Sequence, residues 1–216
     1  MRIALYDLDK TLTRAATFTP FLMFAARRIA PWRLVFAPVW VAMMIGYRAG
    51  LYDRTTLKTR GMRLMLGRAS LAQVEEAGRA FASARIAGSG FMPGTLRLLE
   101  EDRSAGAHVA IATAAFEFYA RAFADHLGIA HVIGTRWDGR TIPGGNCYGA
   151  AKLARVAAWA REEGLSLEDS SVRFVSDSFA DGPLLDRADE AIFVTASARA
   201  ADRARARGWD ARDLGI

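Results

Sequence analysis

Cysteine is almost absent from this chain, which has Cys147 as its single cysteine among 216 residues. A lone cysteine excludes a disulfide framework, and the first strand begins too early for a targeting segment to precede it, so we expect a reducing, cytoplasmic location. Histidine is scarce too: His108, His126 and His131 lack the spacing of a metal site and are expected to be structural. The composition therefore excludes small disulfide-rich domains and His/Cys zinc domains.

A long apolar run is also missing. Residues 34–47 are fourteen residues without a charge, and Pro38 interrupts them, whereas a membrane-spanning helix needs about 20 apolar residues. We expect a helix that is buried in a helical bundle. The alternative is an interfacial surface on anionic lipid, because two tryptophans lie in or beside the run and Arg33 and Arg48 flank it.

Acidic residues are scarce in one part of the chain. Residues 14–90 carry 12 Lys and Arg against 3 Asp and Glu, a net charge of +9, whereas the remainder carries 17 against 20, a net charge of −3. The positive balance therefore lies in 14–90. We do not expect nucleic-acid binding, because the arginines near the C-terminus alternate with alanine and aspartate as they do on a solvated helix.

What the chain does contain is polar residues placed directly after apolar segments. We expect parallel strands near 2–7, 107–112, 131–134, 172–176 and 191–194. The first strand runs into Asp7 and Asp9, and two carboxylates so close together repel each other unless a divalent cation lies between them. The alternative is an Asx turn at Asp9.

Other polar residues follow the later strands. Thr113 comes after 107–112, Asp177 and Asp181 come after 172–176, and Lys152 lies early in an amphipathic helix over 148–163. Each has a plain structural explanation as a helix cap, loop residue or solvated charge. Together, at the edge of the sheet where α/β folds bind ligands, they form a set that neutralises and holds a phosphate.

These residues form four motifs in a fixed order. The motifs are Asp7-x-Asp9-x-Thr11, Thr113, Lys152 and Asp177-x-x-x-Asp181. The set resembles the haloacid-dehalogenase-like superfamily of phosphatases, and the sequence around Lys152 and Asp177 is similar to its phosphoserine-phosphatase-like branch. The resemblance implies an α/β fold with a Rossmann-like parallel-sheet core, residues 1–13 and 91–216, and an all-helical cap inserted at 14–90.

The resemblance also implies a role for each residue. Asp7 is expected to attack the phosphorus and form an aspartyl-phosphate, while Asp9 acts as general acid and then general base. Mg²⁺ is the expected cofactor, held by Asp7, Asp177 and the carbonyl of Asp9. Asp181 is expected to bind a metal water or to orient the lysine.

Two further residues, Thr113 and Lys152, are expected to hold the phosphoryl oxygens. The chain departs from the family pattern at Ala114 and Ala115, where relatives often carry a small polar residue. It also has Ala16 where phosphoserine phosphatases carry the Glu that recognises the substrate amino group, which argues against phosphoserine.

Three functions stay open. The first is a phosphatase of a small phosphorylated metabolite. The second is a phospholipid head-group phosphatase, with a substrate such as phosphatidylglycerophosphate, acting as a peripheral enzyme at the inner face of the membrane. The third is a non-enzymatic, phospho-accepting receiver.

The sequence also marks the ends of the cap helices. Helix starts are expected near Pro20, Pro31, Asp53 and Ser70, and helix ends at Gly50, Gly67 and Gly88. Residues 136–143 are expected to form a hairpin.

Overall fold

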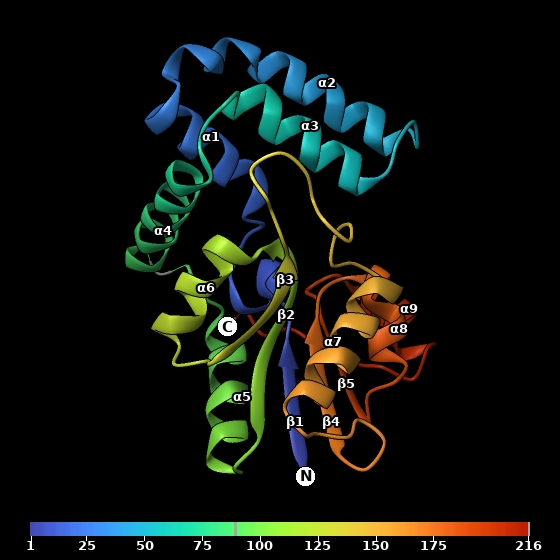
Figure 1. Cartoon of the computed structure of the whole chain (residues 1–216). Helices are drawn as coiled ribbons and strands as arrows, with labels where there is room; N and C mark the ends of the chain where they lie inside the picture. The colour runs from blue at the N-terminus through green and yellow to red at the C-terminus, as the bar shows by residue number, and fades with distance from the viewer. Residues whose placement is uncertain (89, 216) are drawn as a thin grey trace.

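A parallel sheet of six strands, in the order β3-β2-β1-β4-β5-β6, runs through the computed structural model, which describes residues 1–88 and 90–215 (Figure 1). Every neighbouring pair in this sheet is parallel. The strands are β1 (Arg2–Tyr6), β2 (His108–Phe116), β3 (His131–Thr135), β4 (Ser171–Ser176), β5 (Glu190–Val194) and β6 (Asp210–Arg212). The predicted α/β class with a Rossmann-like sheet is confirmed.

Helices cover both faces of the sheet, which is why its central strands are apolar on both sides. One face is covered by α5 (Pro93–Ser104) and α6 (Glu117–His126), and the other by α7 (Ala150–Glu162), α8 (Gly182–Leu185) and α9 (Ala198–Arg205). In β1, Ala4 and Tyr6 pack into the apolar cluster that contains α5 and α6, whereas Ile3 and Leu5 pack into the cluster that contains α7, α8 and α9.

The remaining α-helices and one 3-10 helix stand above the carboxyl edge of the sheet (Figure 1). They are α1 (Phe18–Ile29), the 3-10 helix η2 (Pro31–Phe36), α2 (Ala37–Arg48), α3 (Arg54–Leu66) and α4 (Leu71–Ala87). The chain enters and leaves this group through an antiparallel bridge between Thr13 and Phe91. The predicted boundaries fall on this bridge, and the division into core and cap stays a prediction.

Capping explains where two of these helices start, as the sequence predicts. The Asp53 side chain accepts a hydrogen bond from Thr56 N at 2.8 Å at the start of α3. Ser70 and Gln73 form a reciprocal capping box at the start of α4. Gly67 and Gly88 are the C-caps of α3 and α4.

Two expectations about elements are wrong, and one strand was not predicted. Residues 136–143 contain no strand; instead the Asp138 side chain accepts hydrogen bonds from the backbone N–H groups of Arg140 and Thr141 and closes a turn. β2 continues to Phe116 through an irregularity, so Thr113 lies inside it and not after it. The short edge strand β6 is not among the predicted strands, because three residues with two charges carry no strand pattern.

The expectation of a buried helix over 34–47 is also wrong. In η2 no residue is buried, and in α2 only Trp40 is buried. Among the residues described by the structure, no helix is long and apolar enough to cross a membrane.

A buried carboxylate ties α5 to the sheet. Asp102 is 0% exposed and accepts hydrogen bonds from Tyr6 OH at 2.6 Å, Arg173 Nη1 at 2.8 Å and Arg2 Nη2 at 2.9 Å. Burial and the adjacent Asp102 carboxylate raise the pKa of Tyr6 above its ordinary value, so the hydroxyl stays a donor.

Removal of this charge should destabilise the fold. Asp102→Asn keeps the volume but removes the buried counter-charge of the Arg173 guanidinium, which then keeps only the more exposed Glu190 at 2.7 Å. We expect the free energy of unfolding to fall by roughly 3 kcal/mol. Urea denaturation measures it. Glu100→Gln, an exposed change in the same helix, should stay within about 0.5 kcal/mol of wild type. Equal midpoints for Asp102→Asn and wild type would show that the network does not stabilise the fold.

Candidate active site

The six predicted site residues line one cavity of about 220 Å³ at the carboxyl edge of the sheet. The predicted residues that line it are Asp7, Asp9, Thr113, Lys152, Asp177 and Asp181. Lys10, Arg54, Ala114, Tyr148 and Ser178 complete the lining. The fold therefore brings together predicted site residues that are up to 174 positions apart in the sequence, from Asp7 to Asp181.

Sheet topology explains this convergence. From β1 the chain moves outward through β2 and β3, and then returns to β4 on the other side of β1 before it moves outward again. In open α/β sheets, the crevice at such a switch point binds ligands. Asp7 and Asp177 directly follow β1 and β4, the two strands at this switch point.

A buried lysine links two of the carboxylates. Lys152, 1% exposed, donates to Asp7 Oδ1 at 2.9 Å and to Asp181 Oδ2 at 2.6 Å. Burial by itself would lower the pKa of Lys152, but these two carboxylates raise it above its ordinary value, so the ammonium stays charged. Ser176 Oγ also donates to Asp181 Oδ2 at 2.7 Å, which fixes the carboxylate that holds the lysine.

The cavity has a surplus of carboxylates. Burial raises the pKa of Asp7 to about 7, and the charges of Asp181, Asp177 and Asp9 add to the effect while Lys152 opposes it. Burial and the nearby Asp9 and Asp181 likewise raise the pKa of Asp177 to about 6, against the opposing charge of Lys10. Carboxylates crowded in this way are more easily ionised when a positive charge lies among them.

A tight turn after β1 shapes the site. Residues Leu8–Leu12 form a single π-type turn in which Lys10 has a positive φ of 55°. The turn brings Thr11 Oγ1 to the backbone of the fourth motif, where it accepts from Asp177 N at 3.1 Å. It also aims Asp9 away from the sheet, toward the start of α1.

Comparison with known proteins now identifies the family. The family model for haloacid dehalogenase-like hydrolases matches residues 4–186, which include every motif described above. The chain belongs to this family. Its predicted resemblance and its predicted enzyme class, a phosphatase of the family, are confirmed, and the receiver alternative is set aside.

Two similar proteins support the assignment. The chain is 33% identical over 159 residues to Protein CicA of Caulobacter vibrioides, covering 70% of this chain and 69% of that protein. It is 28% identical over 224 residues to Phosphoserine phosphatase SerB1 of Mycobacterium tuberculosis, covering 99% of this chain and 71% of that protein.

Solved structures share the fold. A protein of unknown function from Bordetella pertussis Tohama I has a TM-score of 0.85 and 27% identity, with 99% of this chain and 98% of that chain covered. A phosphoserine phosphatase in a phospho-aspartyl intermediate analogue form has a TM-score of 0.63 and 19% identity, with 99% and 95% covered, which shows the fold alone.

Within this haloacid dehalogenase-like site, sequence reasoning misses Thr17. Asp9 Oδ1 accepts two hydrogen bonds from Thr17, one from its N–H at 2.8 Å and one from its hydroxyl at 2.6 Å. Thr17 is 0% exposed and its hydroxyl lies 3.2 Å from Tyr119 OH. The Asp9 carboxyl is therefore held through its Oδ1 oxygen.

Lys58, in α3, is a second residue that the motifs do not indicate. It is 2% exposed, and its ammonium donates to the Ala114 carbonyl and to Asn146 Oδ1 at 3.0 Å. Burial, with a contribution from Arg54, lowers the pKa of Lys58 to about 7. Because Ala114 follows Thr113, this contact ties α3 to the segment that is predicted to hold the phosphoryl group.

Arg54, at the start of α3, is the third residue of the site that the motifs do not indicate. It lines the cavity, with its guanidinium 4.7 Å from the centre of the Tyr148 ring. It adds a positive charge on the side of the cavity opposite to the sheet. The only sequence signal is its place directly after the helix cap Asp53, which does not indicate function.

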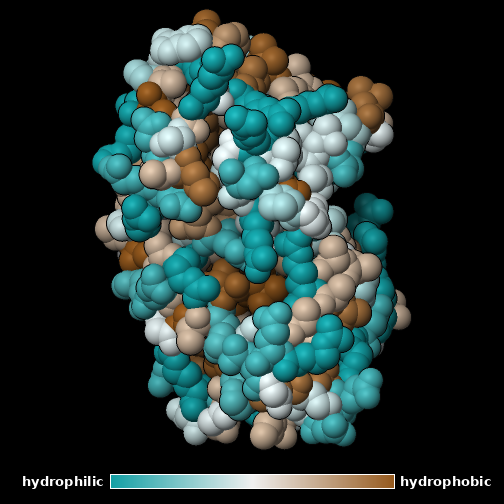
Figure 2. Space-filling view, in the orientation of Figure 1, coloured by the Kyte–Doolittle hydropathy of each residue, from teal (hydrophilic) through white to brown (hydrophobic). Residues whose placement is uncertain are grey.

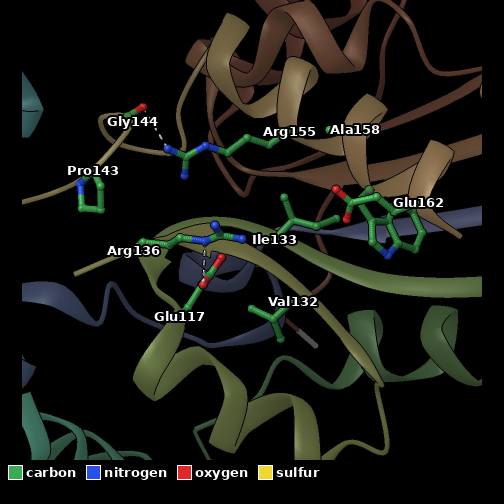
Figure 3. A pocket seen from close by; sticks show the side chains of 10 residues that line it. Glu117, Val132, Ile133, Arg136, Pro143, Gly144, Arg155, Ala158 and Glu162 are labelled. Carbon is green, nitrogen blue, oxygen red and sulfur yellow. Dashed lines mark hydrogen bonds and ion pairs between the residues drawn. The ribbon is translucent and has the colours of Figure 1, made fainter. Parts of the chain in front are cut away.

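A larger hollow of about 540 Å³ lies between β3 and α7 (Figure 3). Its arginines already have partners: Arg155 donates to the carbonyls of Gly134, Gly144 and Gly145 at 2.6–2.9 Å, and Arg136 lies 3.4 Å from Glu117. None of the predicted site residues lines it. We assign these contacts to anchoring of the loop that leads to Asn146, the partner of Lys58, and to Tyr148, which lines the active-site cavity.

Proposed function

We propose that this protein is a magnesium-dependent phosphomonoesterase that works through an aspartyl-phosphate on Asp7. The observation that carries this proposal is the cavity itself. It places the Asp7 carboxylate against Lys152, and it gathers the remaining acidic residues of the motifs around both.

The residues present fit a magnesium ion. Among the residues described, no group of three or more His, Cys, Asp or Glu side chains is placed to hold a metal ion. Mg²⁺, however, keeps several waters and needs only one or two carboxylates besides the substrate phosphate. Asp7, Asp177 and the Asp9 carbonyl would hold it. No group in the described part of the chain donates a hydrogen bond to the buried Asp181 Oδ1, so it would accept from a metal-bound water. When bound, the ion would neutralise charge on the phosphoryl oxygens.

In the first half-reaction, Lys152 holds Asp7 Oδ1, so Oδ2 is the oxygen that attacks the phosphorus. A bond forms between Oδ2 and phosphorus, and the bond to the leaving alcohol oxygen breaks. Asp9 gives its proton to that oxygen, which leaves as a neutral alcohol. Thr17 occupies Asp9 Oδ1, so the proton is carried on Oδ2.

In the second half-reaction, the aspartyl-phosphate is hydrolysed. Asp9, now ionised, takes a proton from water, whose oxygen attacks the phosphorus as the bond to Asp7 breaks. Inorganic phosphate leaves and both carboxyls return to their starting states. In both halves Thr113 and Lys152 hold the phosphoryl oxygens, and the backbone N–H groups near Ala114 supply the contact for which relatives often use a polar side chain.

Positioning of Asp9 by Thr17 gives a kinetic prediction. Thr17→Ala removes the hydroxyl but keeps the backbone N–H, so kcat should fall about tenfold or more with a smaller change in KM. Thr17→Ser restores the hydroxyl and should recover most of the activity. Equal kcat for Thr17→Ala and wild type would remove Thr17 from the mechanism.

The substrate should carry a second negative group and no ammonium. Arg54 supplies a positive charge to the cavity, and Ala16, where phosphoserine phosphatases carry Glu, is exposed and cannot bind an amine. A panel of phosphomonoesters assayed with Mg²⁺ tests this. Phosphoserine as the best substrate would refute the specificity while leaving the reaction class intact.

A phospholipid head group is the second candidate substrate. The observation that favours it is the exposed apolar surface of η2 and α2 on the most basic part of the chain. The same panel, with phosphatidylglycerophosphate in mixed micelles added to the soluble esters, separates the two candidates.

A further inference from the structure

The exposed large apolar side chains of the described residues gather on one segment. Apart from Met1 and Leu71, all of them lie between residues 32 and 51, and they are 47–75% exposed. They are Trp32, Val35, Val39, Val41, Ile45 and Leu51. We call this surface the η2–α2 face. In Figure 2, brown apolar atoms lie along the upper part of the molecule, where Figure 1 places α2.

The packing of α2 does not require these residues. Its inner side supplies Trp40, which is 2% exposed and lies against Gly61 of α3, and Met43, Met44 and Tyr47 also pack against the core. A helix on the surface of a soluble bundle normally has a polar outer side. The outer side of α2 is apolar as well. An exposed apolar surface of this kind marks a site of contact with another molecule or a membrane.

Basic residues outnumber acidic residues around the η2–α2 face. Residues 14–52 contain five arginines and no aspartate or glutamate, and Asp53, the next residue, is exposed but serves as the cap of α3. Arg28 forms an ion pair with Glu76 at 3.1 Å. Arg48, at the end of α2, is exposed. Arg33 lies 4.6 Å from the Trp32 ring centre, but it also donates to the Leu64 carbonyl at 2.7 Å and so has a structural role.

We propose that the η2–α2 face docks on the surface of an anionic lipid bilayer. Exposed apolar side chains that include tryptophan, in a segment with more arginines than acidic residues, match the interface of such a membrane. A second copy of the chain fits less well, because a two-fold contact would bring this basic surface against itself. Docking is independent of the proposed function; only the link to a lipid substrate rests on it.

The position of the face is compatible with that link. Leu51, 75% exposed, is three residues before Arg54, which lines the catalytic cavity. A bilayer that contacts Leu51 would therefore lie close to the N-terminus of α3, where Arg54 is located. This would allow a lipid head group to approach the site.

Co-sedimentation of the full chain with vesicles tests the proposal. Wild type should bind vesicles of phosphatidylglycerol and phosphatidylcholine at low salt, and should bind pure phosphatidylcholine at least about tenfold more weakly. Ile45→Glu, on the η2–α2 face, should lower the partition coefficient about tenfold or more. Leu71→Glu, the same change of charge at an exposed apolar residue outside the face, should stay within about twofold of wild type.

Other outcomes would overturn docking. Wild type that remains in the supernatant with anionic vesicles, or an equal loss in Ile45→Glu and Leu71→Glu, contradicts it. So does a dimer that Ile45→Glu dissociates and that does not bind vesicles, since the face would then pair with a second copy.

The inactive variant Asp7→Asn separates docking from catalysis. It should bind vesicles like wild type, because Asp7 is buried in the cavity and not on this face. Ile45→Glu should hydrolyse a soluble aryl phosphate like wild type. Failure of the phosphatase proposal would therefore leave the vesicle result unchanged, and failure of docking would leave the aryl phosphatase activity unchanged.

Discussion

Asp7→Asn should lower kcat on an aryl phosphate by about 10⁴-fold or more, because an amide cannot take the place of the attacking carboxylate. The fold should survive the change, since Lys152 keeps its 2.6 Å contact with Asp181. Steady-state kinetics with Mg²⁺ measures the loss, and circular dichroism with a thermal melt checks the fold.

The matched control is Asp9, the second carboxylate of the first motif. Asp9→Asn retains the Asp7 nucleophile and should slow both half-reactions by roughly 10²- to 10⁴-fold, the range of a lost general acid or base. A folded Asp7→Asn variant with wild-type kcat would refute covalent catalysis on Asp7.

Removal of divalent cations should have the second-largest effect. Treatment with EDTA should lower activity by roughly 10³-fold or more, because the ion is expected to contribute several kcal/mol of charge stabilisation, and added Mg²⁺ should restore it. Asp177→Asn should weaken Mg²⁺ binding by at least about tenfold, whereas Asp9→Asn should bind nearly as well, since its proposed contact is through the backbone.

Calorimetry of Mg²⁺ binding gives a readout that does not depend on turnover. Equal Mg²⁺ affinity in Asp177→Asn and wild type would contradict the proposed ligand set. Full activity in EDTA would show that the four crowded carboxylates are balanced in some other way than by a metal.

The sequence predicts the acidic part of the site because strands fix its position. Asp7 and Asp177 each follow an apolar strand directly, and parallel strands end at the same edge of a sheet. Order along the chain and distance from a strand end are therefore enough to bring them together. Lys152 follows from its place in the first turn of a helix that packs on the same sheet.

The contributions of the helical segment could not be predicted in this way. Thr17, Arg54 and Lys58 reach the site only because α1 and α3 lie over the sheet edge, and no local pattern encodes that packing. The wrong prediction of a buried helix over 34–47 has a related cause. Its residues are apolar on both sides of the helix, so periodicity does not show that only Trp40 is buried.

Trapping of the covalent intermediate tests whether Asp7 is the nucleophile. The Asp9→Asn variant is mixed with a ³²P-labelled phosphomonoester and Mg²⁺, quenched in acid and digested. We expect a label that is stable in acid and released in base, on the peptide that contains Asp7, and no label in Asp7→Asn. Turnover without any trapped label, or a label on a different residue, would contradict it.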